Sequence, residues 1–101
     1  MSREIVLLPK AQGDINAAYW WYEGQDRGLG DEFLRSLEAS LSRIRVFPQT
    51  YPARFEGFRR ILVRRFPYAV YFEYDDSTVT IYYVFHCAQD PDKLSARLEK
   101  E

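Results

Sequence analysis

The chain has 101 residues, which favours one domain over residues 1–101 with a single hydrophobic core. Its formal net charge of −1 gives it no overall attraction for nucleic acid, and its aromatic content of 17% indicates a core with many rings. A single cysteine, Cys87, excludes an internal disulfide and a cysteine-based zinc cluster, so we expect no bound metal and no cofactor.

No segment has the character of a targeting signal or a membrane span. The apolar run from Ile5 to Leu8 is too short for the core of a signal peptide. Nowhere does the chain approach the roughly 20 apolar residues that a membrane span needs. A single free cysteine suits a reducing compartment. We therefore expect a cytoplasmic protein that has no contact with a membrane.

Apolar periodicity in the first half predicts a strand followed by two helices. Ile5–Leu8 is typical of a short strand, which Pro9 ends. Helical spacing predicts one helix over residues 11–25 and a second over 31–46, with a break at Gly28. Because the link is short, the two helices should form an antiparallel hairpin. The apolar faces are expected at Ala11, Ile15, Ala18 and Tyr22 in the first helix, and at Phe33, Leu37, Leu41 and Ile44 in the second.

The second half predicts a small sheet. After a turn-rich loop that reaches about Gly57, strands are expected over residues 58–65, 68–74 and 78–85, and a short helix over 93–100. In the last strand, alternation places Val79, Ile81, Tyr83 and Phe85 on one face and Thr80 and Tyr82 on the other. The predicted fold is α+β: an N-terminal strand, an antiparallel helix hairpin packed on one face of a small antiparallel sheet, and a short C-terminal helix.

Positive charge is concentrated in one stretch of the sequence. Residues 54–71 contain five arginines against one glutamate, a balance of +4, whereas residues 72–101 contain three basic against seven acidic side chains, a balance of −4. The five arginines are Arg54, Arg59, Arg60, Arg64 and Arg65. The positive field is therefore local, and the acidic neighbours partly cancel it beyond about one Debye length.

Strand alternation divides four of these arginines between two faces. Arg59 and Arg65 are expected on one face, and Arg60 and Arg64 on the other. Two interpretations remain open. Some of the arginines can pair with acidic residues of the neighbouring strand, namely Glu73, Asp75 or Asp76, or at least two of them can form a surface that binds an anion.

Tyr19, Trp20, Trp21 and Tyr22 follow one another in the first helix. Each residue turns the helix by about 100°, so one core-facing side cannot hold all four rings. Part of this aromatic band should therefore lie at the margin of the core or on the outside. Trp20 and Trp21 are candidates either for a core flank or for a docking surface, since exposed aromatic side chains mark interfaces.

Histidine is the side chain best suited to proton transfer near neutral pH, so His86, the only histidine, is a candidate general acid or base. A structural role is favoured, in which His86 closes the last strand and fixes the following turn by hydrogen bonds. Adjacent strand residues point to opposite faces, so His86 and Cys87 do not form a nucleophile pair. A lone histidine and a lone cysteine also predict no metal site.

Several motifs occur in an order that resembles a known family. A short strand and a helix rich in Ala and Tyr precede a helix with Leu-Gly-x-x-Phe-x-x-x-Leu. A proline loop, Gly-x-Arg-Arg, Arg-Phe-Pro-Tyr-x-Val-Tyr-Phe and a late His before Asp-Pro follow. The matching positions are Leu29-Gly30, Phe33, Leu37, Gly57, Arg59, Arg60, Arg65 to Tyr68, Val70, Tyr71, His86 and Asp90-Pro91. Together they resemble the RelE/ParE superfamily of bacterial toxins from type II toxin–antitoxin modules, closest to the ParE (plasmid stabilisation) branch.

The resemblance implies a function as well as the predicted fold. ParE-like members are held to poison DNA gyrase, so it implies a toxin that inhibits gyrase by binding and is neutralised by a cognate antitoxin. It does not imply an enzyme. We expect Arg59, Arg60, Arg64 and Arg65 to contact the target, and Trp20 and Trp21 to contact the antitoxin.

Two alternatives remain open under the same resemblance. RelE-like members are held to cut messenger RNA on the ribosome, and the candidate catalytic residues for that reaction are Arg64, Arg65 and His86. However, no arginine stands at residues 86–90, where that branch commonly has one, and no tyrosine follows Tyr83. The second alternative is an attenuated member that only binds its antitoxin and regulates transcription with it.

Overall fold

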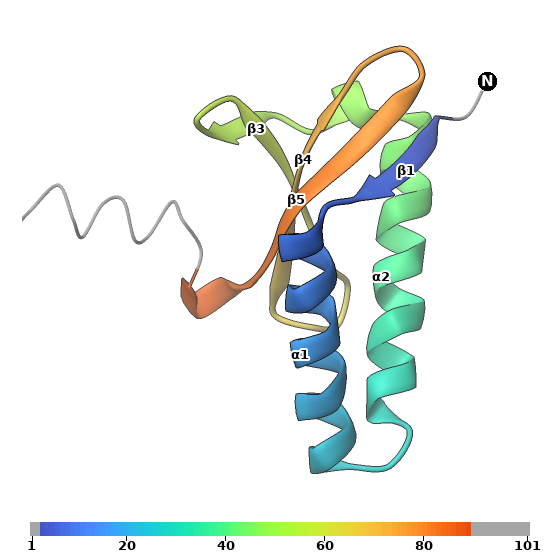
Figure 1. Ribbon diagram of the computed structural model, residues 1–101, viewed down its shortest axis with the longest axis vertical. Coiled ribbons are helices and arrows are strands. Elements are labelled where there is room, and N and C mark those ends of the chain that lie inside the picture. The colour runs from blue at the N-terminus through green and yellow to red at the C-terminus, as the bar shows by residue number, and fades with distance from the viewer. Residues whose placement is uncertain (1–2, 90–101) are drawn as a thin grey trace, which may run out of the picture.

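Within residues 3–89, which the computed structural model of the protein describes, the chain forms two α-helices, two 3₁₀-helices and five strands (Figure 1). The elements in chain order are β1 (Glu4–Leu7), α1 (Pro9–Gln25), α2 (Leu29–Val46), η1 (Pro48–Thr50), β2 (Ala53–Phe55), β3 (Phe58–Leu62), β4 (Tyr68–Tyr74), β5 (Thr78–His86) and η2 (Cys87–Gln89). The helix predicted over residues 93–100 lies outside the described residues. None of the described helices combines the length and apolar character that crossing a bilayer requires.

The predicted helix hairpin is confirmed, and its link is held by a carboxylate. Pro9 begins α1, where its missing N–H and fixed φ suit the first helical position. Gly28, at a φ of 90°, takes the left-handed conformation between the helices. The Glu23 carboxylate accepts hydrogen bonds from the amides of Gly28, at 3.1 Å, and Gly30, at 3.0 Å. A Cβ on Gly30 would lie 2.8 Å from the Tyr19 carbonyl oxygen, so glycine permits this close approach of α2 to α1.

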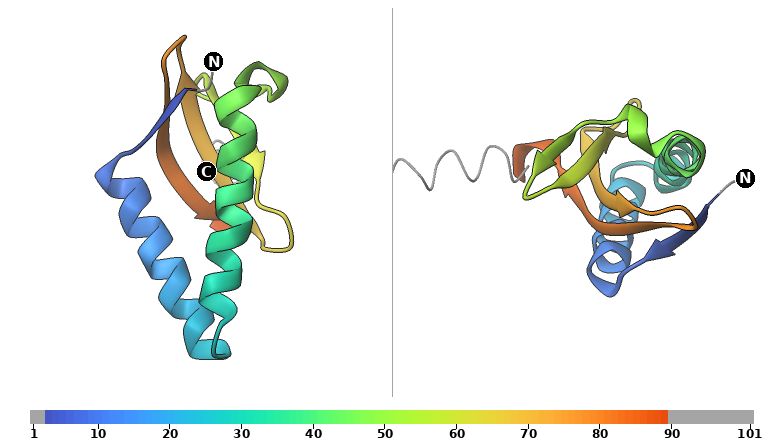
Figure 2. Two further views of the ribbon diagram at one scale, coloured as in Figure 1. Left: turned by 90° about the vertical axis from the view of Figure 1, so that its right-hand side faces the viewer. Right: turned by 90° about the horizontal axis from the view of Figure 1, so that it is seen from above.

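The five strands form one sheet in the order β1-β5-β4-β3-β2, with the helices packed on one face (Figures 1 and 2). The pairs β3–β4 and β4–β5 are antiparallel, as predicted, and the pair β2–β3, which was not predicted, is antiparallel as well. The N-terminal strand β1 joins the sheet as a parallel neighbour of β5, with Glu4 opposite Thr78. Strand β2, which is short and follows Pro52, lies in the segment predicted to be a loop.

The core lies between the helix hairpin and the sheet. The four residues predicted on the apolar face of α1 are all buried. In α2 the predicted stripe is buried except for Leu41, which is partly buried. The remaining core residues come from the sheet and from the turn that follows β3. They are Ile61, Val70, Phe72, Val79, Ile81 and Val84 in the sheet and Val63 in the turn. The fold is therefore the predicted α+β arrangement, with an antiparallel-dominated sheet.

A bulge in β5 changes which side chains reach the core. Tyr71 of β4 lies opposite Tyr83. The next residue, Phe72, lies opposite Ile81, so Tyr82 is an extra residue in β5. Beyond this residue the alternation shifts by one position, and Val84 enters the core. The prediction that Tyr83 and Phe85 share a face with Val79 and Ile81 is therefore wrong.

Candidate functional site

A tight turn, residues 63–67, places Arg64 and Arg65 together. The Val63 amide donates to the Tyr68 carbonyl at 2.9 Å and closes the turn between β3 and β4. Arg65 has a φ of 70°, in the left-handed region that non-glycine residues seldom adopt. The predicted strand to Arg65 therefore ends early, at Leu62. Strand alternation does not apply to Arg64 and Arg65, so the prediction that they lie on opposite faces is wrong.

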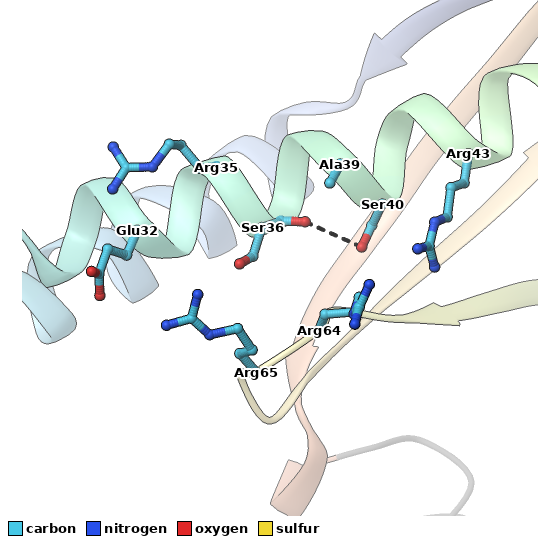
Figure 3. A pocket seen from close by; sticks show the side chains of 8 residues that line it. All are labelled: Glu32, Arg35, Ser36, Ala39, Ser40, Arg43, Arg64 and Arg65. Carbon is cyan, nitrogen blue, oxygen red and sulfur yellow. Dashed lines mark hydrogen bonds between the residues drawn. The ribbon is translucent and has the colours of Figure 1, made fainter.

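The turn and helix α2 enclose a cleft of about 380 Å³, which we call the arginine cleft. Its lining residues are Glu32, Arg35, Ser36, Ala39, Ser40, Arg43, Arg64 and Arg65. Figure 3 shows Arg65 below Glu32 and Ser36, and Arg64 below Ser40 and Arg43. Arg35 lies at the rim and extends away from the turn. The cleft thus brings the guanidinium groups of Arg43, Arg64 and Arg65, with Arg35 at the rim, against a single carboxylate.

The arginines of the cleft have no partner among residues 3–89. The structure shows no ion pair or hydrogen bond from the side chain of Arg35, Arg43, Arg64 or Arg65 to any described residue. The Ser40 hydroxyl donates to the Ser36 carbonyl at 3.3 Å, within α2. The positive charge is therefore left for a ligand or for solvent.

The sequence analysis did not identify Arg35 and Arg43 as site residues. For Arg43 the sequence offers another role. Positive charge in the last turn of a helix complements the helix dipole, which accounts for Arg43 without a site. The signal that points to them is their spacing. Residues 35, 39 and 43 recur every four positions and so share one side of α2. Nothing in the sequence shows that the β3–β4 turn packs beside that side.

Arg59 and Arg60 lie on β3, apart from the arginine cleft. The Arg59 guanidinium donates to the Tyr51 carbonyl and lies 5.1 Å from the centre of the Tyr74 ring. These contacts tie β3 to the preceding loop and to β4. Arg60 lies opposite Tyr71 in the sheet. Their assignment to a target surface stays a prediction.

The acidic residues of β4 and the β4–β5 turn have other partners than the turn arginines. The Glu73 carboxylate accepts a hydrogen bond from the Tyr82 hydroxyl at 2.9 Å. The Asp75 carboxylate accepts the amides of Ser77 and Thr78, both at 2.8 Å, and these hydrogen bonds lower the pKa of Asp75. Within residues 3–89, no ion pair joins this acidic group to Arg64 or Arg65.

His86 lies in a second cleft, between α1 and the end of β5, together with Asp14, Trp21 and Tyr68. Its Nδ1 accepts the Ala88 amide at 3.0 Å, which fixes the turn after the strand, as the favoured structural role predicted. Neither Arg64 nor Arg65 lines this cleft. The structure therefore does not bring the three predicted ribonuclease candidates into one site.

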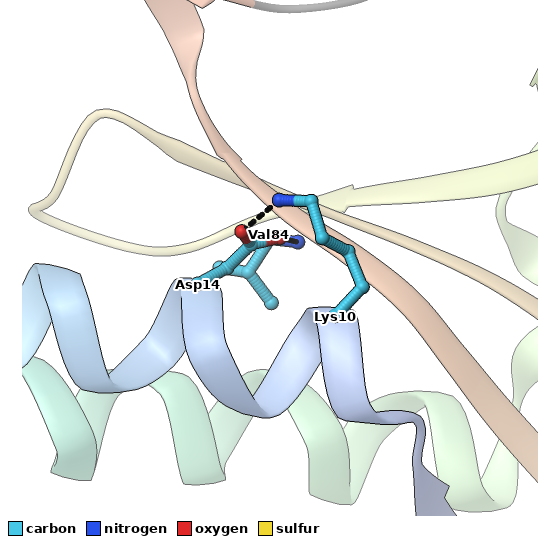
Figure 4. Close-up of polar contacts among 3 residues, drawn as sticks. All are labelled: Lys10, Asp14 and Val84. Carbon is cyan, nitrogen blue, oxygen red and sulfur yellow. Dashed lines mark hydrogen bonds and ion pairs between the residues drawn. The ribbon is translucent and has the colours of Figure 1, made fainter.

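A partly buried carboxylate attaches α1 to β5 at this second cleft (Figure 4). Asp14 accepts the Val84 amide at 3.0 Å and also pairs with Lys10. The bond satisfies an amide of β5 beyond the point where β1 ends. Burial, and secondarily the charge of Asp14, raise the pKa of the Tyr68 hydroxyl. This carboxylate is structural, because it fixes the position of α1 on the sheet.

The exposed side of α1 forms a second candidate surface, which we call the α1 face. Trp20 and Trp21 are 68% and 59% exposed, as predicted for part of the aromatic band. The exposed residues of α1 from position 12 to its end at position 25 carry no charge. They are Gln12, Gly13, Asn16, Ala17, Trp20, Trp21, Gly24 and Gln25. A charge-free helix side with two exposed indoles is typical of a protein interface.

The two glycines of the α1 face have no role inside the described part of the chain. A Cβ at Gly13 or Gly24 would meet no atom within 4 Å. Each glycine inside a helix costs about 1 kcal/mol relative to alanine. The same residues also leave the helix backbone open to close approach from outside. For metals, no group of three or more His, Cys, Asp and Glu side chains in residues 3–89 could hold an ion.

The fold belongs to a known class of small α+β proteins. A solved chain described as "Chromosomal ParDE TA system from P. aeruginosa" is similar at a TM-score of 0.73 and 15% identity. The similarity covers 84% of this chain and 96% of that chain. At this identity the likeness shows the fold alone. Comparison with curated proteins gave no match.

The family follows from the sequence itself. The profile described as "ParE toxin of type II toxin-antitoxin system, parDE" matches residues 5–91, most of the chain. The chain therefore belongs to the ParE toxin family, within the RelE/ParE superfamily. The resemblance seen in the order of its motifs is thus confirmed.

Proposed function

We propose that this protein is the toxin of a type II toxin–antitoxin module and that it inhibits DNA gyrase by binding. The family match over residues 5–91 carries the assignment. Binding is favoured over RNA cleavage because the candidate acid–base residue His86 and the turn arginines line different clefts. The arginine cleft is the target surface under this proposal, with Arg64 and Arg65 at its centre and Arg35 and Arg43 added by α2.

The same proposal assigns the α1 face to the cognate antitoxin. Trp20 and Trp21 are exposed, and the exposed residues of α1 from position 12 to 25 carry no charge, so covering the two rings removes apolar area from water. The charged residues that share the second cleft with Trp21 are Lys10 and Asp14, which already pair with each other. Tryptophan is enriched among the residues that dominate interface energies. Target and antitoxin then contact different sides of the helix hairpin.

The test uses purified protein in a gyrase supercoiling assay and an assay for cleaved DNA trapped on gyrase. Wild-type protein should inhibit supercoiling and accumulate cleaved DNA. Arg64→Gln combined with Arg65→Asn should lose both effects, because the double variant lacks both guanidinium groups of the turn. Asparagine is chosen at position 65 because it tolerates the left-handed backbone there. Arg27→Ala, which removes another exposed arginine, is the matched control and should behave as wild type.

Two other outcomes separate the alternatives. Codon-positioned cuts in messenger RNA on translating ribosomes, with no effect on gyrase, would favour the RelE-like endoribonuclease. Induced expression that leaves bacterial growth unchanged would favour the attenuated member that only binds antitoxin. Either result contradicts the gyrase proposal.

A further inference from the structure

The arginine cleft has the composition of a site for a ligand with several negative charges. We propose that it binds consecutive phosphates of a DNA strand, so that the toxin contacts the DNA which gyrase holds. This inference rests on the proposed function for its biological setting, but the binding it describes requires no gyrase. It also assigns the cleft a ligand class that the family membership does not specify.

The first support is charge without partners. The guanidinium groups of Arg43, Arg64 and Arg65 face the cleft, a fourth, that of Arg35, lies at its rim, and one carboxylate, Glu32, opposes them. None of the four has a hydrogen bond or ion pair to a residue in the described part of the chain. Like charges gathered in this way repel one another, and a bound anion removes that repulsion. The cleft is therefore more stable occupied by an anion than empty.

The second support is the type and spacing of the cations. All four are arginines, whose planar fork matches two phosphate oxygens at once. Arg35 and Arg43 lie eight residues apart in α2, about 12 Å along the helix axis. A DNA strand carries one phosphate per about 3.4 Å of the duplex axis, so a duplex whose axis runs along α2 presents about three phosphates of one strand over this distance. The spacing fits a polyanion better than a single free phosphate.

The third support is the wall of the cleft and the conformation of the turn. Between the arginines, α2 presents only Ser36, Ala39 and Ser40, small residues that let a sugar–phosphate chain approach the helix. Arg65 reaches the cleft from a left-handed backbone position, at a φ of 70°. Strain of this kind clusters at functional sites, where it fixes a side chain that a relaxed turn would direct elsewhere.

DNA is favoured over an acidic protein segment as the ligand. Carboxylates on a protein would also pair with arginines, but their spacing follows side chains and not a regular chain of charges. The cleft is open along α2 and is lined by polar and small residues, with no large apolar side chain to contact a protein partner. The net charge of −1 includes the positive cleft, so the rest of the chain is net negative and adds no attraction for DNA. The contacts in the cleft should therefore set the affinity.

The experiment measures binding of the full chain to a short fluorescent duplex DNA by anisotropy, without gyrase. Three to four phosphate contacts predict a slope of log affinity against log salt of about −3, and an affinity loss of about 100-fold between 50 and 200 mM salt. Arg64→Gln with Arg65→Asn should weaken binding at least about 10-fold at 50 mM salt and reduce the slope by about 2. Arg35→Gln with Arg43→Gln should do the same.

Controls and competitors decide the outcome. Arg27→Ala should bind DNA as wild type does, and each variant should keep its circular dichroism spectrum. Inorganic pyrophosphate should compete with DNA, whereas a glutamate-rich peptide at equal charge should compete far less. Equal weakening by Arg27→Ala, or a slope near zero, overturns the proposal. Stronger competition by the peptide also overturns it and assigns the cleft to protein carboxylates.

The gyrase assay keeps the two proposals separate. If DNA binds through the cleft but supercoiling continues, the gyrase proposal fails and the DNA site stands. If gyrase is inhibited and the arginine variants abolish inhibition without any DNA binding in the first assay, the DNA site fails and the gyrase proposal stands.

Discussion

The α1 face and the arginine cleft lie on the two helices of one hairpin and are opposite in character. The α1 face has two exposed indoles and no charge from position 12 to 25. The arginine cleft has four guanidinium groups and lies on the α2 side of the hairpin, where the β3–β4 turn packs (Figure 2). The comparison shows that one small domain can offer two binding surfaces, one to each of two partners, and that binding to the two surfaces has different driving forces. One surface binds by desolvating apolar area and the other by neutralising charge.

The largest expected effect is on the α1 face. Trp20→Ala with Trp21→Ala should weaken antitoxin binding at least about 100-fold, because buried tryptophans at an interface each contribute about 2 kcal/mol or more. DNA binding by the same variant should be unchanged. Isothermal titration calorimetry with purified antitoxin measures the first effect. Phe47→Ala removes another exposed aromatic ring, 58% exposed, and should bind antitoxin normally. An equal loss in Phe47→Ala would contradict the assignment of the face.

The next largest effect concerns Asp14, the carboxylate that attaches α1 to the sheet. Asp14→Ala removes the acceptor of the Val84 amide and should lower the free energy of unfolding by about 1–3 kcal/mol, because the amide is left without a partner. Asp14→Asn keeps an acceptor oxygen and should lose less. Urea unfolding compares the three proteins. Equal losses in the two variants would show that the charge and the Lys10 pair matter more than the hydrogen bond.

Glycine substitutions test how closely the antitoxin approaches α1. Gly13→Ala and Gly24→Ala should each raise the free energy of unfolding by up to about 1 kcal/mol, since the added methyl group meets no atom. If the antitoxin backbone packs against this face, both variants should bind antitoxin more weakly although they are more stable. Gly30→Ala is the contrasting control and should be destabilised by its clash with Tyr19. Unchanged antitoxin affinity would place the antitoxin on another surface.

The smallest effect is at the turn of the arginine cleft. Arg65→Gly should raise the free energy of unfolding by about 0.5–1 kcal/mol, because glycine takes a φ of 70° without strain. The same change should weaken DNA binding by the loss of one phosphate contact. Thermal unfolding and anisotropy measure the two effects on one preparation. Loss of stability in Arg65→Gly would show that the side chain itself supports the fold.

Local patterns in the sequence were sufficient to predict most of the fold. The stripe through Phe33 and Leu37, and the small residues of α1, follow helical spacing whatever the rest of the chain does, and both are buried as predicted. Exposure of part of the aromatic band also followed from helix geometry, since four consecutive rings cannot share one side, and the structure shows that the exposed part is Trp20 and Trp21. These features depend on neighbours in the sequence, which is why they were predictable.

The errors arose where distant residues decide the local structure. The bulge at Tyr82 is set by pairing with β4, so simple alternation placed Tyr83 and Phe85 on the wrong face. The left-handed backbone at Arg65 ends β3 early, and no glycine or asparagine in the turn signals it. The contribution of α2 to the arginine cleft depends on how the turn packs beside the helix. Sequence spacing alone does not contain that information.

The parallel pairing of β1 with β5 has a consequence for the order in which the sheet can form. Among the described strands β1 comes first in the chain, yet within residues 3–89 its only partner in the sheet is β5, with Glu4 opposite Thr78. Its backbone amides and carbonyls therefore have no strand partner until β5 has been synthesised. Contacts between such distant segments form slowly, because a long loop must close first. A chain synthesised only as far as β4 thus lacks the finished sheet, and β1 can take its native place only after β5 is available.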